Sequence, residues 1–280
     1  MGLVVETIKD MFNFVLKYPK SFLFSFIINL FIFIGAMAMA GGVLISIGPA
    51  LETATQSSLV PGVSSFLLMN VPRLAGAVVF AIIGFIIILI AGLVRSGGFP
   101  ILVYQAAKRH KLDLASIFQT TLRKLSKIFV ANLISGIIVL LPLVPAFILI
   151  FGSISGISSL NFTPFIFAIV LALVFFVIAA FLGIRLWLTI PILMIENRGA
   201  MDSVKASWER TEGQLVSIIG VSILYALVVG LPLAAINALL NLAGVYVYSA
   251  WTLIEGIITA TLSGVLPVIY YFNSRSMRRR

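Results

Sequence analysis

The chain has 280 residues, of which 61% are hydrophobic and only 10% are charged, with a formal net charge of +10. A soluble domain has about a quarter of its residues charged, and a globule this apolar would aggregate in water. We therefore expect an integral membrane protein, whose basic residues flank its membrane helices and do not indicate nucleic-acid binding. The lack of cysteine excludes disulfides, thiolate metal sites and a cysteine nucleophile.

Six apolar runs are long enough to cross a bilayer, which requires about 20 residues each. They cover residues 22–47, 74–94, 128–150, 163–184, 215–240 and 248–271. Arg73 is the only Lys or Arg in the three loops on one side, and the other 18 of the 19 lie on the opposite side. Because basic loops stay inside, we expect a multi-pass plasma-membrane protein with both termini in the cytoplasm.

Three further segments, residues 4–16, 114–125 and 201–212, carry apolar side chains at helical spacing and precede the odd-numbered spans. We expect each to be an amphipathic helix lying on the inner membrane surface. The third belongs to segment 196–213, which holds four of the nine acidic residues of the chain. This segment is either a connector that rests on the bilayer or a docking surface for a partner protein.

The same order of parts occurs three times, which predicts an internal repeat. Each unit is a surface helix followed by a two-span hairpin, and Pro100, Pro191 and Pro267 recur where the even-numbered spans end. The units are residues 1–105, 106–197 and 198–273, followed by a basic tail at 274–280. Units with two crossings keep one orientation, so the repeats are parallel. The predicted fold is an all-α polytopic membrane protein, one domain over 1–280, with six transmembrane helices as three parallel repeats.

Two sequence segments resemble a known family. They are PILMIENRGAMDSVKASWERTEGQ (191–214) and PVIYYFNSR (267–275). The family consists of six-span bacterial and archaeal membrane proteins, and it includes the membrane domain fused to some glycerophosphoryl diester phosphodiesterases. The matching residues of the first segment are Pro191, Glu196, Asn197, Gly199, Ala200, Ser207 and Trp208, while Asn273 in the second stands where an Asp is common. The resemblance implies a membrane domain and no reaction, and we expect no catalytic barrel in this chain.

Polar side chains within the odd-numbered spans are candidate lipid or solute contacts. They are Ser25 and Asn29 in the first span, Asn132 and Ser135 in the third, and Ser222 and Tyr225 in the fifth. Polar groups in hydrocarbon need partners, so we expect them to face the bundle interior. They either form interhelical hydrogen bonds or line a polar pocket that opens to the cytoplasm.

Three charged residues complete the candidate contacts. Arg95 and Arg185 lie at the inner ends of spans two and four, where they either bind a phosphate or another anion or extend to the interface. Glu255 is the only acid inside a predicted span. We expect it to face the bundle interior with Asn237 or Asn241 as partner, or else to stay hydrated among the outer headgroups.

No combination of titratable residues matches a catalytic or metal site, and the single histidine, His110, lies in a basic loop. We therefore expect no enzyme activity, no cofactor and no metal. The predicted function is a non-enzymatic, lipid-associated or accessory scaffold module, with membrane lipids, including anionic headgroups at the cytoplasmic face, as partners. The alternative is a transporter or channel for a small or amphiphilic solute with a cavity on the pseudo-threefold axis. The middle of the predicted spans is nearly free of charged residues, which favours the scaffold function over the transporter.

Overall fold

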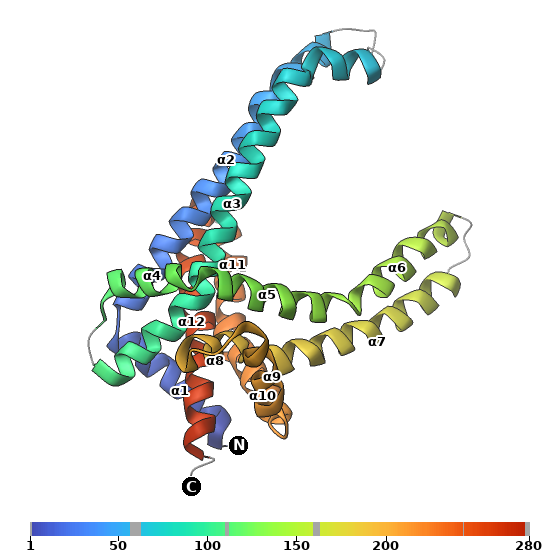
Figure 1. Ribbon diagram of the computed structural model, residues 1–280. Helices are drawn as coiled ribbons and strands as arrows, with labels where there is room; N and C mark the ends of the chain where they lie inside the picture. Colours follow the sequence, from blue (N-terminus) through green and yellow to red (C-terminus); the bar gives the residue numbers. More distant parts are fainter. Residues whose placement is uncertain (1, 57–62, 110–111, 159–162, 243, 278–280) are drawn as a thin grey trace. The chain divides into compact units, whose positions relative to one another are not determined.

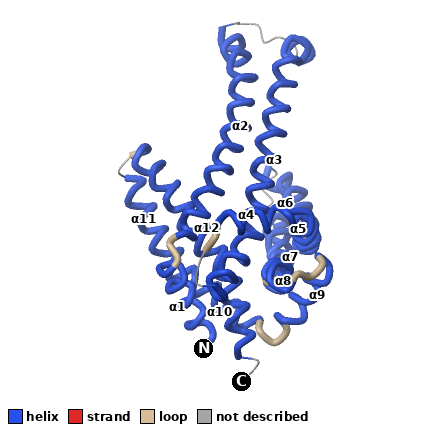
Figure 2. Tube along the Cα trace, turned by 60° about the vertical axis from the view of Figure 1, so that its left-hand side comes forward, coloured by secondary structure: helices blue, strands red, loops and turns tan. Residues whose placement is uncertain are grey.

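The computed structural model describes residues 2–56, 63–109, 112–158, 163–242 and 244–277, and this part of the chain is helical without strands (Figures 1 and 2). The elements are α1 (Gly2–Lys17), α2 (Lys20–Gln56), α3 (Val63–Arg109), α4 (Leu114–Arg123), α5 (Leu125–Leu140), α6 (Leu143–Ser158), α7 (Thr163–Leu186), α8 (Thr189–Glu196), α9 (Ala200–Thr211), α10 (Leu215–Tyr225), the π-helix η1 (Ala226–Gly230), α11 (Leu231–Leu242) and α12 (Val245–Met277).

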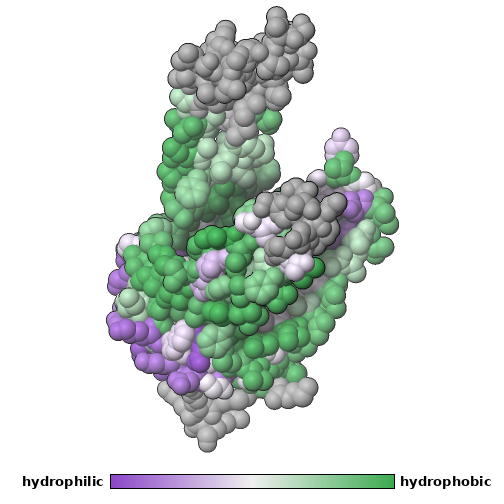
Figure 3. Space-filling model, turned by 90° about the vertical axis from the view of Figure 1, so that its right-hand side faces the viewer, coloured by the Kyte–Doolittle hydropathy of each residue, from purple (hydrophilic) through white to green (hydrophobic). Residues whose placement is uncertain are grey.

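All six predicted spans coincide with helices. Five stretches are long and apolar enough to cross a bilayer by themselves: Lys20–Gly42, Ala75–Lys108, Phe165–Glu196, Leu215–Leu242 and Val245–Ser276. The remaining predicted span consists of α5 and α6, which meet at an angle of 46°. Apolar side chains cover most of the coloured surface in Figure 3, and most of the strongly hydrophilic ones gather at its lower left. The prediction of an all-α, multi-pass membrane protein is therefore confirmed, with five spans or six if the bent pair counts as one.

Prolines explain the irregular helices. Pro142 separates α5 from α6, because a proline lacks the backbone N–H and its ring clashes with the carbonyl group four residues earlier. Pro232 is the second residue of α11, and the π-helix η1 ends two positions before it at Gly230, where the wider turn accommodates the same clash. By contrast, Pro191 falls in the first turn of α8, where the missing N–H would have no partner within the helix.

The chain forms two compact units. One comprises Phe22–Arg95, and the other comprises Met1–Ser21 together with Ser96–Arg280. In the first unit, α2 and α3 run side by side (Figure 1) and approach closely at two glycines. A Cβ atom on Gly84 would meet the carbonyl oxygen of Gly35, and one on Gly35 would lie 2.8 Å from the carbonyl oxygen of Gly84. Small residues at this crossing therefore let the two backbones pack closely.

The second unit is organised around α12. Helix α1 packs on α10 and α12, while α9 packs on α5, α7 and α8. The C-terminal part of α3 reaches α12 through Phe99, whose ring occupies the space that a Cβ on Gly264 would need. The second half of α12 is consequently well buried, with Val265, Tyr270 and Tyr271 at most 1% exposed.

The three predicted amphipathic segments are helices, namely α1, α4 and α9. Asp113 begins α4 as its N-cap, because its carboxylate accepts hydrogen bonds from the backbone N–H groups of Ala115 and Ser116. Their placement in the membrane plane and the threefold relation between the hairpins stay predictions.

Candidate functional site: a carboxylate shared by α8, α9 and α12

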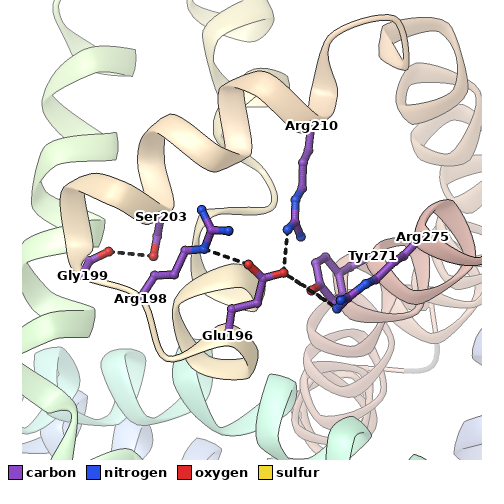
Figure 4. Close-up of polar contacts among 7 residues, drawn as sticks. All are labelled: Glu196, Arg198, Gly199, Ser203, Arg210, Tyr271 and Arg275. Atoms are coloured by element: carbon purple, nitrogen blue, oxygen red, sulfur yellow. Dashed lines mark hydrogen bonds and ion pairs between the residues drawn. The ribbon is translucent and has the colours of Figure 1, made fainter. Parts of the chain in front are cut away.

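A sharp turn places Glu196 beside α9. Helix α8 ends at Glu196, and Asn197 follows in the left-handed conformation with φ of 55°. Asparagine tolerates this conformation better than most residues, which is why it commonly follows helix C-termini. The extended Gly199 then begins α9. The turn brings the carboxylate of Glu196 to the start of α9 together with Arg198 (Figure 4).

Four polar side chains surround the Glu196 carboxylate, and we call these five residues the Glu196 cluster (Figure 4). Arg198 Nε lies 2.8 Å from Oε2, and Arg210 Nη2 lies 2.6 Å from Oε1. Tyr271 donates its hydroxyl proton to Oε1 over 2.5 Å. Arg275 Nη1 is more distant, at 3.9 Å from Oε1. Three guanidinium groups face one carboxylate, so the cluster carries an excess of positive charge.

Arg210 is the central cation of the Glu196 cluster. Burial by itself would lower the pKa of its guanidinium, but hydrogen bonding with Tyr271 and Glu196 and the nearby carboxylate charge together raise that pKa. Its guanidinium carbon also lies 5.2 Å from the centroid of the Tyr271 ring, within cation–π range. Next to this contact, Tyr270 donates to Oε1 of Gln214 at 3.2 Å. The two tyrosines therefore connect the end of α12 to the C-terminal end of α9.

Arg185 anchors α9 to the end of α7. Its carbonyl oxygen accepts a hydrogen bond from Ser207 at 2.8 Å, and Thr211 Oγ1 lies 3.3 Å from it while donating over a shorter 2.9 Å to the carbonyl of Ser207. Carbonyls in the last turn of a helix have no partner within that helix, so the Ser207 hydroxyl satisfies an otherwise open acceptor. Its guanidinium lies about equally far from the rings of Phe181 and Trp208, at 5.3 and 5.2 Å. Arg185 thus contacts α9, and its predicted role in binding phosphate stays a prediction.

The face of α9 that packs against the protein is largely not the apolar face that we expect to lie on the membrane. Met201, Val204 and Trp208 share one apolar stripe, but Val204 is buried whereas Met201 and Trp208 are 53% and 40% exposed. The residues that pack against the rest of the unit are mostly small and polar, including Ser207 and Thr211. Hydrogen bonding to the end of α7 is the physical reason, because it favours hydroxyl side chains over large apolar ones at the contact.

Two cavities border the Glu196 cluster. The larger has a volume of about 810 Å³ and is lined by Tyr104, Lys108, Ile195, Glu196, Phe272, Arg275 and Ser276. The smaller has a volume of about 150 Å³ and is lined by Arg210, Gln214, Tyr271, Ser274 and Arg275. Arg275 belongs to both. Basic side chains line both cavities, and such a surface suits an anion.

The polar residues predicted within the spans have varied surroundings. Asn132 donates to Ser96 Oγ at 3.3 Å, and Ser222 donates to the carbonyl of Ile218 in its own helix. In the described part of the chain, the buried Ser135 hydroxyl has no hydrogen-bond partner. Tyr225 is half-buried on α10. The hydrogen bond of Asn132 supports the interhelical interpretation for that residue, and the structure does not gather these side chains into one site.

Three candidate contacts belong to the α2–α3 unit. Ser25 is 1% exposed, and the side-chain nitrogen of Asn29 is buried without a hydrogen-bond partner among the described residues. Arg95 is half-buried at the boundary of the unit. Lipid or solute contact at these positions stays a prediction.

Glu255 forms a hydrogen bond with one of its two predicted partners. Asn237 on α11 donates its side-chain N–H to Oε1 of Glu255 at 2.8 Å. Trp251 donates its indole N–H to Oδ1 of the same asparagine at 2.6 Å. These three side chains, which we call the Glu255 triad, connect α11 to α12. Whether Glu255 contacts a lipid or a solute stays a prediction.

The two segments that resemble a family meet in space. Glu196 lies in the first segment and Tyr271 in the second, and the hydrogen bond between them joins residues 75 positions apart. A family model described as the membrane domain of glycerophosphoryl diester phosphodiesterase matches residues 5–276. The chain belongs to this family. The resemblance predicted from the sequence is therefore confirmed, whereas no curated protein and no solved structure matches the chain.

The family membership describes a membrane domain and says nothing about a reaction of this chain. Sequence reasoning identified Glu196 among the residues that match the family, but it did not identify Lys108, Tyr271 or Arg275 as its neighbours. The signal that could have found two of them was the second family segment, which contains Tyr271 and Arg275. Lys108 carried no signal, because it is one of three basic residues close together in the sequence, with Arg109 and Lys111.

Proposed function

We propose that this membrane domain is a non-enzymatic, lipid-associated scaffold module of the plasma membrane. In this proposal both termini and the helices α1, α4 and α9 lie at the cytoplasmic face, and segment 196–213 presents a surface to a protein partner. The three units 1–105, 106–197 and 198–273 are parallel repeats, a relation supported by the position of α1, α4 and α9, each of which precedes a pair of long apolar segments.

One observation carries the proposal, namely the way α9 is fixed. Its small polar face is bonded to the end of α7, while Met201 and Trp208 remain exposed beside the charged Lys205. Large apolar side chains next to a cationic one suit the boundary between headgroups and acyl chains. Tryptophan in particular favours this zone, because its ring is apolar and its N–H can stay hydrated.

Fluorescence quenching tests this placement of α9. With Trp187 and Trp251 replaced by phenylalanine, Trp208 is the only tryptophan left, and the variant is reconstituted into vesicles with lipids brominated at different depths. We expect the strongest quenching from lipids brominated close to the headgroup. If no brominated lipid quenches Trp208, α9 does not touch the bilayer and the proposal fails.

Cysteine labelling tests the orientation, since the natural chain has no cysteine. A cysteine at Lys205 on α9 should be protected from an impermeant maleimide added outside the cell. One at Tyr246, which is 89% exposed at the start of α12, should react. The reverse pattern would invert the proposed topology.

The transporter alternative is supported by the polar groups inside the helices, above all the buried hydroxyl of Ser135, which has no hydrogen-bond partner among the described residues. Buried groups of this kind mark water-accessible pathways in some membrane proteins. Osmotic shrinkage of proteoliposomes in glycerol, amino acids and glycerol phosphate separates the two functions. We expect vesicles that contain the protein to be no more permeable to these solutes than empty vesicles. A higher permeability that is lost in Ser135→Leu would favour the transporter.

A further inference from the structure

The larger cavity beside the Glu196 cluster is an open groove between three segments, and we call it the phosphate groove. It is bordered by the C-terminal end of α3, the end of α8 and the end of α12. These are also the last residues of three candidate spans, which finish at Lys108, Glu196 and Ser276. A groove at the ends of three candidate spans is where lipid headgroups would lie.

Two cations of the groove have unused capacity for hydrogen bonding. Both oxygens of Glu196 are already paired with Arg198 and Arg210, at 2.8 and 2.6 Å. Nη1 of Arg275, whose side chain is 51% exposed, donates to the hydroxyl oxygen of Tyr271 at 3.3 Å and lies 3.9 Å from the same carboxylate. A guanidinium group has five N–H donors, so the donors on the other two nitrogens of Arg275 remain for a ligand.

Lys108 is the second of these cations. It is exposed at the end of α3, and its ammonium nitrogen lies 4.7 Å from the centroid of the Tyr104 ring. Among the described residues it has no ion pair with a carboxylate. The ring contact holds the ammonium group at the edge of the groove without neutralising it.

The remaining lining limits the chemistry of the ligand. Arginine binds phosphate oxygens in a forked geometry, while lysine adds a point charge. The rings of Tyr104 and Phe272 supply apolar walls, and Ser276 adds a hydroxyl group. The volume of about 810 Å³ lies within the range of small-molecule sites. These features suit an anionic phosphate group attached to a partly apolar body.

We propose that the phosphate groove binds the phosphate of an anionic phospholipid, with Lys108 and Arg275 as its ligands. This proposal rests on the lipid-associated function proposed above and gives it a specific site. Free phosphate esters share the same chemistry. A lipid is the favoured source because the groove borders the ends of three apolar spans, alongside which acyl chains would lie.

The test compares thermal unfolding of the purified full chain in a nonionic detergent supplemented with phosphatidylglycerol or with phosphatidylcholine. We expect phosphatidylglycerol to raise the Tm by several degrees over phosphatidylcholine, because a ligand that binds only the folded state stabilises it. In Lys108→Gln/Arg275→Gln, the affinity for phosphatidylglycerol should fall about tenfold or more, as expected from losing two charge-assisted contacts.

Two further variants keep this test decisive. Lys9→Gln/Lys127→Gln removes the same charge from exposed positions outside the groove and should keep the response to phosphatidylglycerol. Lys108→Arg/Arg275→Lys retains both charges and should keep most of it. If the groove variant responds like the Lys9/Lys127 control, the proposal is overturned. If the groove variant does not fold, Lys108→Gln alone replaces it, because this change leaves the Glu196 cluster intact. Loss of its response to phosphatidylglycerol then supports the proposal, and a retained response overturns it.

Inorganic phosphate and glycerol phosphate identify the source of the ligand. We expect neither, at millimolar concentration, to reproduce the Tm rise given by the lipid. If glycerol phosphate does so in the wild type but not in the groove variant, the lipid source is overturned. The thermal unfolding test is also independent of the Trp208 quenching experiment. If Trp208 is not quenched but the response to phosphatidylglycerol is normal, the proposed position of α9 is refuted. If Trp208 is quenched but the groove variant keeps the response, only the phosphate groove is refuted.

Discussion

Glu196 and Glu255 contact different parts of the second unit and have partners of different kinds. Glu196, at the end of α8, is surrounded by three guanidinium groups and the hydroxyl of Tyr271. Glu255 lies within α12 and receives its hydrogen bond from the neutral amide of Asn237. Tyr271 and Glu255 are 16 positions apart on α12, which corresponds to about 24 Å along a helix.

This separation approaches the thickness of the hydrocarbon core, about 30 Å. The two sites therefore correspond to two solutions for placing a carboxylate in a membrane protein. Where charged groups can reach water, the carboxylate is paired with cations. Within an apolar segment, a neutral hydrogen-bonding partner avoids placing a further charge in a low-dielectric environment. Removing each carboxylate should therefore have a different consequence.

The largest expected effect comes from Glu196→Ala. This change leaves Arg198 and Arg210 without their carboxylate, and the Glu196 side chain is only 14% exposed. Breaking a buried pair costs about 3–5 kcal/mol, and the partial exposure of both arginines reduces the expected loss in the free energy of unfolding to about 2–3 kcal/mol. Reversible unfolding in mixed micelles, followed by circular dichroism, measures this loss.

Glu209→Ala is the matched control for that variant. It removes the same charge from an exposed position on α9, so its free energy of unfolding should stay within about 0.5 kcal/mol of the wild type. Equal stability of the two variants would show that the Glu196 cluster contributes nothing to the fold.

The next effect in size is that of Tyr271→Phe, which removes one hydrogen bond to a charged acceptor. Such bonds contribute about 1.5–3 kcal/mol, whereas neutral ones contribute about 0.5–1.5 kcal/mol. Tyr270→Phe is the natural comparison, because the Tyr270 hydroxyl donates to the neutral side chain of Gln214. We expect Tyr271→Phe to lower the free energy of unfolding by about 2 kcal/mol and Tyr270→Phe by about 1 kcal/mol. The reverse order would mean that the charge of Glu196 does not strengthen its hydrogen bond.

The membrane helices could be predicted from the sequence because their signal is local. A run of about 20 apolar residues needs no knowledge of the rest of the fold, and all six predicted spans coincide with helices. The ion pairs of Glu196 with Arg198 and Arg210 join residues that are close in the chain. Tyr271 and Arg275 were not assigned to this site, because only tertiary packing brings α12 to α8.

Helix α9 shows a different limit of sequence reasoning. Its apolar pattern placed Met201, Val204 and Trp208 on one membrane-facing side, yet Val204 is buried in the protein. The apolar pattern reflects only the hydrophobicity of the side chains. It contains no information about backbone carbonyl groups elsewhere in the fold that need a hydrogen-bond donor. The carbonyl oxygen of Arg185 is such a group, and the hydroxyls of Ser207 and Thr211 turn their side of α9 toward it.

Glu255→Ala should have a smaller effect than either change in the Glu196 cluster, because only a neutral hydrogen bond is lost. Asn237 retains its bond with Trp251 in this variant, so we expect the free energy of unfolding to fall by about 1 kcal/mol. Glu255→Gln keeps an oxygen that can accept from Asn237 and should match the wild type. If the alanine variant is as stable as the wild type, water can replace the Glu255 carboxylate as the hydrogen-bond acceptor of Asn237.

The smallest expected effect is that of Trp251→Phe, which retains an aromatic ring but removes the indole N–H. That N–H donates to Oδ1 of Asn237 over 2.6 Å, and losing one neutral hydrogen bond at a half-buried position should cost about 0.5–1 kcal/mol. Because Trp251 and Glu255 share Asn237, their changes should not be additive. In a double-mutant cycle, Trp251→Phe combined with Glu255→Ala should destabilise the protein by an amount that differs from the sum by at least about 0.5 kcal/mol. Additive losses would mean that the two hydrogen bonds act independently, and that Asn237 does not couple α11 to α12 through the Glu255 triad.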